Sequence, residues 1–394
     1  MNMNNRVGVD ECVEVNSDTT RLQRLCAHSR KKKIMWIIIL IICIDVIITI
    51  PAIIITRNKK EKEKISTATE ITTEITTTVT TTRTVQILPS IIIDNNTKWK
   101  QNAVTVAGGN GWDSGSNQLN YPYGIYIDND DESIYIADAM NHRIVRWELD
   151  AKASKIVAGG NGRGNRIDQL DFPADVILDK EKKYVIICDN GNKRVVRWSR
   201  QNSQDQQIWI SSIMCRGFSM DNNGDIYISD MENYQVRRFQ EGDSIGKVVA
   251  GGNDHGDQLN QLSTPTLIFV DEYYTVYVTD SVNNRVMKWK KNATEGIRVT
   301  PKLVSANNPN SLHNMDGMIV DHVGNVYVSN FDGYQITRWS PHAIEGTPVV
   351  GDKQCGSEPM QLKNPHDISF DRDGNLYIVD TDNHRIQKFI IDLD

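Results

Sequence analysis

The stretch Ile134–Trp147, with the sequence IYIADAMNHRIVRW, constrains the fold most strongly, because similar stretches recur five more times before the chain ends. The copies begin at Val185, Ile226, Val276, Val326 and Leu376. Aligning them places one polar column at steps of 41 to 51 residues, and its members are Asp138, Asp189, Asp230, Asp280, Asn330 and Asp380. A regular period of this length indicates a repeat architecture.

Each copy predicts two strands and the turn that joins them. The first half alternates apolar and small residues and is rich in Ile, Val and Tyr, which favours a pleated, buried strand. Asp, two variable residues and Asn or Gly follow, and these residue types favour a turn. The second half alternates again and ends at an aromatic residue. Because the polar column recurs in every repeat, we predict a structural role for it, with the carboxylates accepting turn amides and arginines such as Arg143 packing between repeats.

Each repeat contains four strand-like pieces, which in the first repeat are Tyr123–Asp128, Ile134–Asp138, Arg143–Glu148 and Lys155–Ala158. Short strands that repeat in fours predict an all-β propeller. The sixth repeat lacks a fourth strand, whereas the matching sequence Val-Ala-Gly-Gly-Asn stands unused at 106–110, before the first repeat. We therefore expect this N-terminal strand to complete the last blade and to close a ring of six blades without free edges.

The pattern Tyr-Ile-Ala-Asp-x-x-Asn-His-Arg resembles the NHL repeat, and Asn141-His142-Arg143 and Asn383-His384-Arg385 come closest to it. The resemblance covers residues 99–394 and implies a six-bladed NHL-type β-propeller. The third repeat departs from the pattern with Tyr234-Gln235 in place of His-Arg. It also follows a segment, 207–214, that lacks the Gly-Gly-Asn loop.

The N-terminal region contains an apolar segment, Ile34–Ile55, whose single charged residue is Asp45. A run of this length spans the hydrocarbon core as a helix. It is too long for a cleaved signal peptide, and a polar segment precedes it. We predict a signal anchor that contacts the lipid bilayer at 34–55, a cytoplasmic tail at 1–33 and a Thr-rich stalk or linker at 56–98.

The orientation of this anchor is not set by flanking charge, because six basic residues precede it and five follow it. Eleven of the twenty residues in 65–84 are Thr, a composition typical of O-glycosylated stalks. Glycosylation sequons begin at Asn95 and Asn292. We predict a single-pass type II membrane protein with an extracellular or lumenal propeller.

The cysteines form no regular framework, and the sequence contains no Cys-x-x-Cys pair that would favour a thiolate metal site. Cys188 ends a predicted strand in the second repeat, and Cys215 opens the third repeat. We expect these positions to lie on the same face of adjacent blades and to form a disulfide.

Function is expected where the repeats differ, above all at the starts of the innermost strands, which line the mouth of the channel. The polar and aromatic residues there are the candidate ligand contacts Tyr123, Asp175, Arg216, Asp316, His366 and Asp367. The net charge of −6 argues against nucleic acid as a partner, since nucleic-acid-binding domains are usually basic.

Two enzyme classes carry related propellers. The lyase that cleaves peptidyl-α-hydroxyglycine uses a channel zinc bound by histidines, and the sequence Pro-His-Asp-Ile at 365–368 resembles one of its motifs. A catalytic zinc requires three protein ligands, whereas His366 is the single histidine among the equivalent strand positions. Tripartite-motif ubiquitin ligases depend on a RING domain that the sequence lacks. The sequence therefore favours a non-enzymatic binding platform for a protein, peptide or glycan, without catalytic residues, metal or cofactor.

Overall fold

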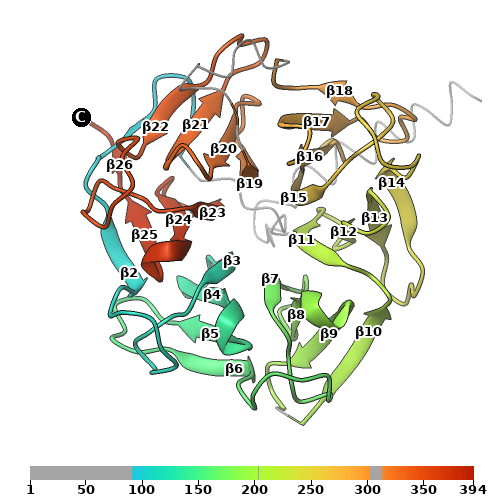
Figure 1. Ribbon diagram of the computed structural model, residues 1–394, viewed down its shortest axis with the longest axis vertical. Helices are drawn as coiled ribbons and strands as arrows, with labels where there is room; N and C mark the ends of the chain where they lie inside the picture. Colours follow the sequence, from blue (N-terminus) through green and yellow to red (C-terminus); the bar gives the residue numbers. More distant parts are fainter. Residues whose placement is uncertain (1–90, 203, 302–311, 313) are drawn as a thin grey trace, which may run out of the picture. The chain divides into compact units, whose positions relative to one another are not determined.

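The computed structural model describes residues 91–202, 204–301, 312 and 314–394. Within these residues, six four-stranded antiparallel sheets surround a central channel like the blades of a propeller (Figure 1). The strands nearest the channel are β3 (Pro122–Asp128), β7 (Pro173–Leu178), β11 (Cys215–Met220), β15 (Pro265–Val270), β19 (Met315–Val320) and β23 (Pro365–Phe370). The predicted all-β, six-bladed architecture is confirmed.

The first blade continues outward from β3 through β4 (Ser133–Asp138), β5 (Arg143–Trp147) and β6 (Lys155–Gly159). The next three blades add β8 (Tyr184–Asp189), β9 (Arg194–Ser199), β10 (Gln206–Ser211), β12 (Ile226–Asp230), β13 (Gln235–Phe239), β14 (Lys247–Gly251), β16 (Val276–Asp280), β17 (Arg285–Trp289) and β18 (Ile297–Arg298). The last two add β20 (Val326–Asn330), β21 (Gln335–Trp339), β22 (Thr347–Val350), β24 (Leu376–Asp380) and β25 (Arg385–Phe389). Every residue of β4 is buried, because neighbouring blades cover both faces of the strand.

The sixth blade is completed by β2 (Val104–Gly108), which pairs antiparallel with β25 and places Val104 opposite Lys388. The predicted closure of the ring by an N-terminal strand is therefore confirmed. A separate two-stranded sheet, β1 (Lys98–Trp99) with β26 (Ile391–Asp392), joins the two ends of the described chain beside this blade. Closure pairs the outer edge that the last blade would otherwise expose.

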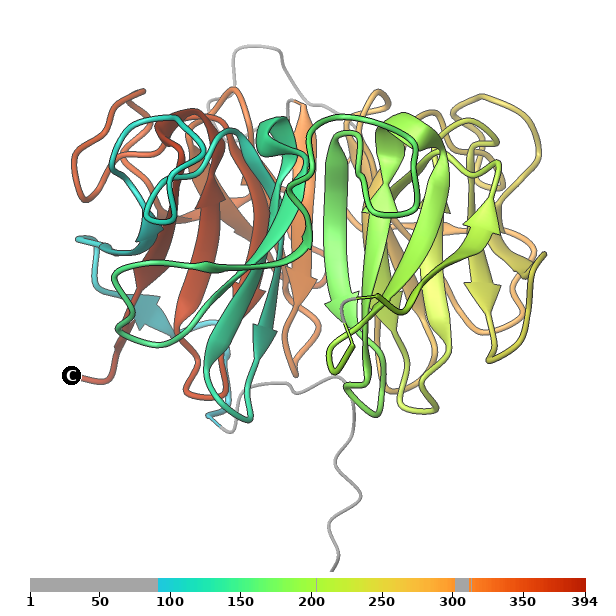
Figure 2. The same cartoon turned by 90° about the horizontal axis from the view of Figure 1, so that it is seen from below.

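The ring has two different faces, which Figure 2 shows from the side. The upper face carries the 3-10 turns η2 (Ala139–Asn141), η3 (Asn190–Asn192) and η4 (Thr381–Asn383) and the long loops between blades. The lower face carries the tight turns that follow each inner strand, such as the turn closed by the Gly224 amide and the Asp221 carbonyl at 2.9 Å. Each inner strand therefore runs from the upper face to the lower face.

The described residues just before the predicted start of the propeller at Trp99 pack against the ring. Ile93 has no exposed surface, and Trp99 is 2% exposed. Both side chains pack against the sixth blade, where the Trp99 indole donates a hydrogen bond of 2.8 Å to the Gly374 carbonyl on the lower face. Ile93, which precedes the predicted boundary after residue 98, is thus buried against the propeller.

The remaining N-terminal predictions lie outside the described residues. These are the cytoplasmic tail at 1–33, the transmembrane helix at 34–55 and the stalk up to residue 90. Among residues 91–394, apart from the short gaps named above, no helix has the length and apolar character that a membrane span needs.

The polar column ties each blade to the loop that precedes it. Asp138 accepts the Asn120 amide at 2.7 Å, the Asn141 side chain at 2.8 Å and Nε of Arg143 at 2.7 Å. Arg143 in turn donates to the Ser114 carbonyl of the preceding loop at 2.8 Å. The same arrangement recurs at Asp189, Asp280 and Asp380. These bonds give the column a structural part in the repeat.

The third blade departs from this arrangement because the loop before it is absent. Residues 212–214 join β10 directly to β11, whereas 160–172 join the first blade to the second. Gln235 of the third blade, like Gln335 of the fifth, stands where the other four blades place arginine, and Gln235 donates to Asp230 at 3.1 Å. A disulfide between Cys188 of β8 and Cys215 of β11, with Cα atoms 5.7 Å apart, links the two blades here. This is the cysteine pair expected from the sequence.

Candidate functional site

The upper end of the channel is occupied by a network from the second position of three inner strands. Arg216 of β11 donates to the Asp316 carboxylate of β19 at 3.0 Å. His366 of β23 lies with Nδ1 2.6 Å from the same carboxylate oxygen of Asp316 and 3.4 Å from the Arg216 guanidinium. The Arg216 and Asp316 side chains are 13% and 14% exposed, so their mutual pairing takes place largely out of water.

Aromatic rings enclose this network. The Tyr123 ring stacks on His366 with centroids 4.2 Å apart, and the Arg216 guanidinium lies 4.3 Å from the centre of the same ring. Phe331 meets His366 edge to face at 5.2 Å, and Phe172 meets Tyr123 at 4.9 Å. The network and its rings, which we call the upper plug, consist of Tyr123, Arg216, Asp316 and His366 with Phe172 and Phe331 around them.

The electrostatics of the upper plug are balanced internally. Burial alone would raise the pKa of Asp316, but Arg216 and His366 outweigh burial and hold that pKa far below its ordinary value. Burial opposes the charge of Arg216, yet Asp316 raises the pKa of the guanidinium. Both groups are therefore charged at neutral pH, and each serves as the counterion of the other.

The third position of the inner strands forms a second layer, in which glycines alternate with larger residues around the ring. The glycines are Gly124, Gly217 and Gly317, and the larger residues are Asp175, Leu267 and Asp367. A Cβ atom on Gly124 would lie 2.6 Å from the Asp175 Cα atom, and one on Gly317 would lie 2.1 Å from the His366 carbonyl oxygen. Each larger residue thus has room only because its neighbour has no side chain.

The two carboxylates of this layer are buried and held by backbone amides. Asp175 is 4% exposed and accepts the Val176 and Phe218 amides, both at 2.7 Å. Asp367 is 8% exposed and accepts the Ile368 amide at 2.8 Å and the Ile125 amide at 2.9 Å. In each case one amide comes from the following blade, so the aspartate also links neighbouring blades. Leu267 occupies the third equivalent place and has no acceptor to offer.

The pKa values of these two carboxyl groups shift in the opposite direction from that of Asp316 in the upper plug. Burial raises the pKa of Asp367 to about 7, although the two amides oppose this shift and Asp316 adds to it. Burial, together with repulsion from Asp367, raises the pKa of Asp175 well above its ordinary value. The second layer therefore carries less negative charge at neutral pH than two ordinary aspartates would.

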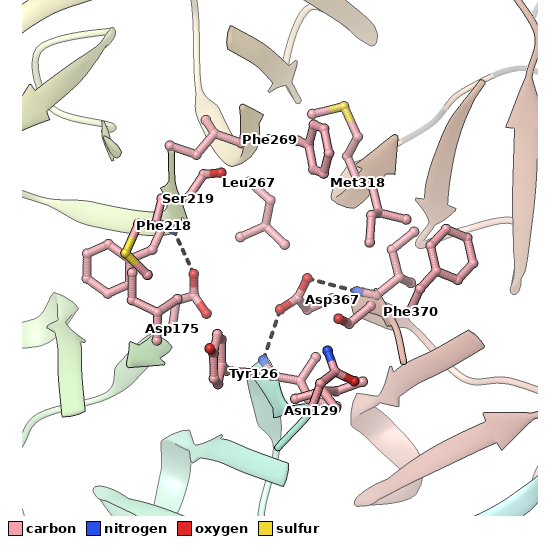
Figure 3. Close-up of a pocket in the computed structure, with 18 residues that line it drawn as sticks. Tyr126, Asn129, Asp175, Phe218, Ser219, Leu267, Phe269, Met318, Asp367 and Phe370 are labelled. Carbon is pink, nitrogen blue, oxygen red and sulfur yellow. Dashed lines mark hydrogen bonds between the residues drawn. The ribbon is translucent and has the colours of Figure 1, made fainter. Parts of the chain in front are cut away.

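A cavity of about 170 Å³ occupies the lower part of the channel, below the second layer. Figure 3 shows Asp175, Asp367 and Leu267 at its centre, with aromatic and aliphatic side chains around them. The wall comes from the fourth and fifth positions of the inner strands, which include Phe218, Met318, Tyr126, Phe269, Ile319 and Ser369. Tyr126, Phe269, Ile319 and Ser369 are partly exposed, so the cavity meets solvent at the lower face.

The structure thus divides the six predicted site residues between two layers. Tyr123, Arg216, Asp316 and His366 come together in the upper plug, whereas Asp175 and Asp367 lie beneath it and face the cavity. The cavity wall at the fifth strand position was not predicted. Its signal was present in the sequence, because that position holds Tyr, Ile, Ser or Phe in different repeats and so varies as the second position does.

The residues around His366 do not assemble a zinc site. Within the described parts of the chain, no group of three or more His, Cys, Asp or Glu side chains is placed to hold a metal ion. The groups nearest His366 are a carboxylate, a guanidinium and two rings, and the carboxylate is already paired with Arg216. This arrangement gives no support to the lyase alternative, which needs further histidines beside His366.

The two predicted glycosylation sites lie on the surface. Asn292 and Thr294 are exposed in the turn before β18. Asn95 is exposed in the segment before β1, and its side chain accepts the Ser340 hydroxyl at 3.0 Å. Both asparagines thus remain candidates for glycosylation.

The closed ring of six four-stranded blades defines a six-bladed β-propeller. Residues 218–348 match the family model of the SMP-30/gluconolactonase/LRE-like region, and residues 362–389 match the model of the NHL repeat. Together with the ring, these matches identify an NHL-type six-bladed propeller. No curated protein matches the chain.

Several solved structures share this architecture. A protein of unknown function from Bacteroides thetaiotaomicron is 17% identical, with a TM-score of 0.58 and coverage of 74% of this chain and 76% of that one. An auxiliary nutrient binding protein from the same organism is 13% identical, with a TM-score of 0.58 and coverage of 75% and 77%. A catalytically inactive virginiamycin B lyase from Staphylococcus aureus with quinupristin is 14% identical, with a TM-score of 0.50 and coverage of 75% and 99%. At such identities the likeness shows the fold alone.

Proposed function

We propose that this protein is a non-enzymatic binding platform whose lower channel receives one terminal group of a protein, peptide or glycan ligand. The observation that carries this proposal is the cavity of about 170 Å³ beneath a plug of mutually paired side chains. Ligand pockets are concave and mostly apolar, with a few convergent polar groups. The lower channel has this character, with Asp175, Asp367, Asn129, Ser219 and Ser369 among its polar groups.

The upper plug is a weaker candidate for direct ligand contact. A ligand that bound Arg216 or Asp316 would have to separate two buried opposite charges, and breaking such a pair is costly. The non-enzymatic character is supported by the same geometry, since His366, the histidine that the described residues place in the channel, is engaged by Asp316 and covered by two rings. An auxiliary nutrient binding protein shares the architecture, which is compatible with a binding role.

The experiment that tests this function captures ligands with the full-length protein and compares two charge insertions. Ile319→Arg places a cation at the lower mouth, and Val282→Arg places one on the upper face, where Val282 is 62% exposed. We expect ligand capture to be lost in I319R and retained in V282R. Capture that survives I319R and disappears in V282R would move the binding site to the upper face and overturn the proposal.

We further propose that the propeller is displayed outside the cytoplasm by the predicted anchor at 34–55, as a single-pass type II membrane protein. The Thr-rich composition of 65–84 and the exposed sequons at Asn95 and Asn292 support this topology. Glycosidase treatment of the full-length protein from a secretory host should increase its electrophoretic mobility. The double variant Asn95→Gln with Asn292→Gln is the matched control. An unchanged mobility of the wild-type protein would contradict the topology.

A further inference from the structure

The lower channel contains two acidic groups without a cationic partner among the residues that the structure describes. Asp175 and Asp367 accept backbone amides, but neither forms an ion pair with a Lys, Arg or His of the described residues. The nearest guanidinium that acts on both, Arg216, is bound to Asp316. An ionised buried carboxylate without a counterion is costly, so burial raises the pKa of both groups, and a ligand that brings positive charge would offset this cost.

We propose that the lower channel binds a protonated amine on an apolar stem or ring, with the ammonium against Asp175 and Asp367 and the apolar part against Phe218, Leu267 and Met318. This inference rests on the function proposed above and adds the chemical class of the group that enters the channel. The carboxylates can still accept hydrogen bonds from the ammonium, because each oxygen accepts one amide and has a second lone pair. An ammonium offers three donors.

An organic cation fits this cavity better than a metal ion does. Calcium takes six to eight oxygen ligands, and magnesium requires near-octahedral oxygen coordination. Here the third equivalent place of the second layer is filled by Leu267, and the wall below it is mainly aliphatic and aromatic. A metal ion would gain nothing from that wall, whereas an apolar stem or ring leaves water by contacting it.

The size of the cavity limits the bound group to about one ring. An engineered cavity of about 150 Å³ in another protein holds benzene, and the lower channel has a volume of about 170 Å³. Benzylammonium therefore suits this volume. Butylammonium, which reproduces the end of a lysine side chain, also suits it. These two cations share the proposed chemistry and represent a free aromatic amine and a lysine of a protein ligand, respectively.

The binding of an amine at this site should depend on pH. Burial raises the pKa of Asp367 to about 7, so its carboxyl group becomes ionised as the pH rises through this value. The titratable and charged groups around it are Asp175 in the same layer, Arg216, Asp316 and His366 of the upper plug above, and Tyr126 of β3 at the wall below. An ammonium favours the ionised carboxylate, so the affinity for amines should rise with pH across this range.

The test measures binding to the full-length protein by calorimetry with benzylammonium, butylammonium and the neutral analogue benzyl alcohol, at about pH 8 and about pH 6, on either side of the carboxyl pKa. We expect benzylammonium to bind at least about tenfold more tightly than benzyl alcohol at the higher pH, and to lose most of this preference at the lower pH. Asp367→Asn should remove the preference and retain the binding of benzyl alcohol. Asp332→Asn, which neutralises an exposed carboxylate of the upper face, is the matched control and should keep the preference.

The outcomes separate this inference from the proposed function. Equal binding of benzylammonium and benzyl alcohol overturns the inference but leaves a functional cavity. Binding of neither probe overturns both. Tighter binding of calcium than of either amine also overturns the inference. If D367N does not fold, Asp175→Asn and the pH profile of the wild-type protein test the same charge. Preference for butylammonium over benzylammonium would identify a lysine side chain as the better source of the amine.

Discussion

The two ends of the channel are built from adjacent positions of the same six strands, yet they treat charge in opposite ways. At the upper end, Arg216, Asp316 and His366 neutralise one another, and rings fill the space around them. At the lower end, Asp175 and Asp367 have backbone amides as partners and border an open cavity. The comparison indicates that a variable polar residue marks a binding site only when neighbouring side chains do not neutralise its charge.

The difference arises from one residue choice in each layer. In the second position, Arg216 supplies the cation that Asp316 needs. In the third position, the residue equivalent to the two aspartates is Leu267, and the alternate positions are glycines. The upper layer is thus complete without a ligand. The lower layer lacks its counterion, and a repeat fold tolerates this because backbone amides hold the carboxylates in place.

The largest effect should follow from removing the anion of the upper plug. Asp316→Ala leaves the guanidinium of Arg216 buried without a counterion, and we expect the free energy of unfolding to fall by about 3–5 kcal/mol. Denaturant unfolding measures this change. The double variant Arg216→Met with Asp316→Leu removes both charges and should recover most of the loss. If D316A alone costs no more than the double variant, the upper plug is not a paired unit.

A second test concerns the pH dependence of stability that the lower carboxylates impose. In the unfolded chain an aspartate titrates near about 3.9, whereas burial raises the pKa of Asp367 to about 7. Between these values the folded state binds more protons, so stability falls as the pH rises, by up to about 1.4 kcal/mol per pH unit from this group.

Asp367→Asn should therefore flatten the decline of stability between about pH 4 and about pH 7. Unfolding midpoints measured across this range check the prediction. Asp332→Asn, at the exposed upper face, should leave the slope unchanged. A slope in D367N equal to that of the wild-type protein would show that the lower carboxylate is not the group that titrates.

The fold could be predicted almost completely from the repeats. The column from Asp138 to Asp380 predicted the number of blades, and the unused sequence at 106–110 predicted the closure of the ring. The departures were also visible, since Gln235 and the short segment 212–214 occur together. The packing of Ile93 could not be read from the repeats, because its contacts are made with the sixth blade, nearly 300 residues away in sequence.

The site could be predicted only in part. The sequence identified the residues at the starts of the inner strands, but it could not show that Arg216 and Asp316 meet across the channel, because they are 100 residues apart. Each inner strand also contains a register irregularity near its start, as between Pro122 and Ile125. Strict alternation therefore does not tell whether the second or the third position faces the cavity. The burial that raises the pKa of Asp367 is a property of the closed ring and has no counterpart in the linear pattern.

A smaller effect is expected from blocking the lower mouth. Ser369→Trp places a large ring where a small, partly exposed side chain now borders the cavity. We expect the affinity for benzyl alcohol to fall at least about tenfold, which corresponds to about 1.4 kcal/mol. Phe331→Trp enlarges a ring at the upper plug and serves as the control, with unchanged affinity. Equal losses in both variants would mean that the two ends of the channel do not act separately.

The smallest effect should come from the rim of the upper plug. Phe331→Ala removes the ring that meets His366 edge to face at 5.2 Å. Aromatic contacts of this kind contribute about 0.5–1.5 kcal/mol beyond burial, so we expect a loss of about 1 kcal/mol in unfolding free energy. Probe binding at the lower face should not change, because the ion pair between Arg216 and Asp316 does not include this ring. If F331A weakens benzylammonium binding as strongly as Asp367→Asn does, the plug and the cavity form one site, and the contrast between the two ends of the channel fails.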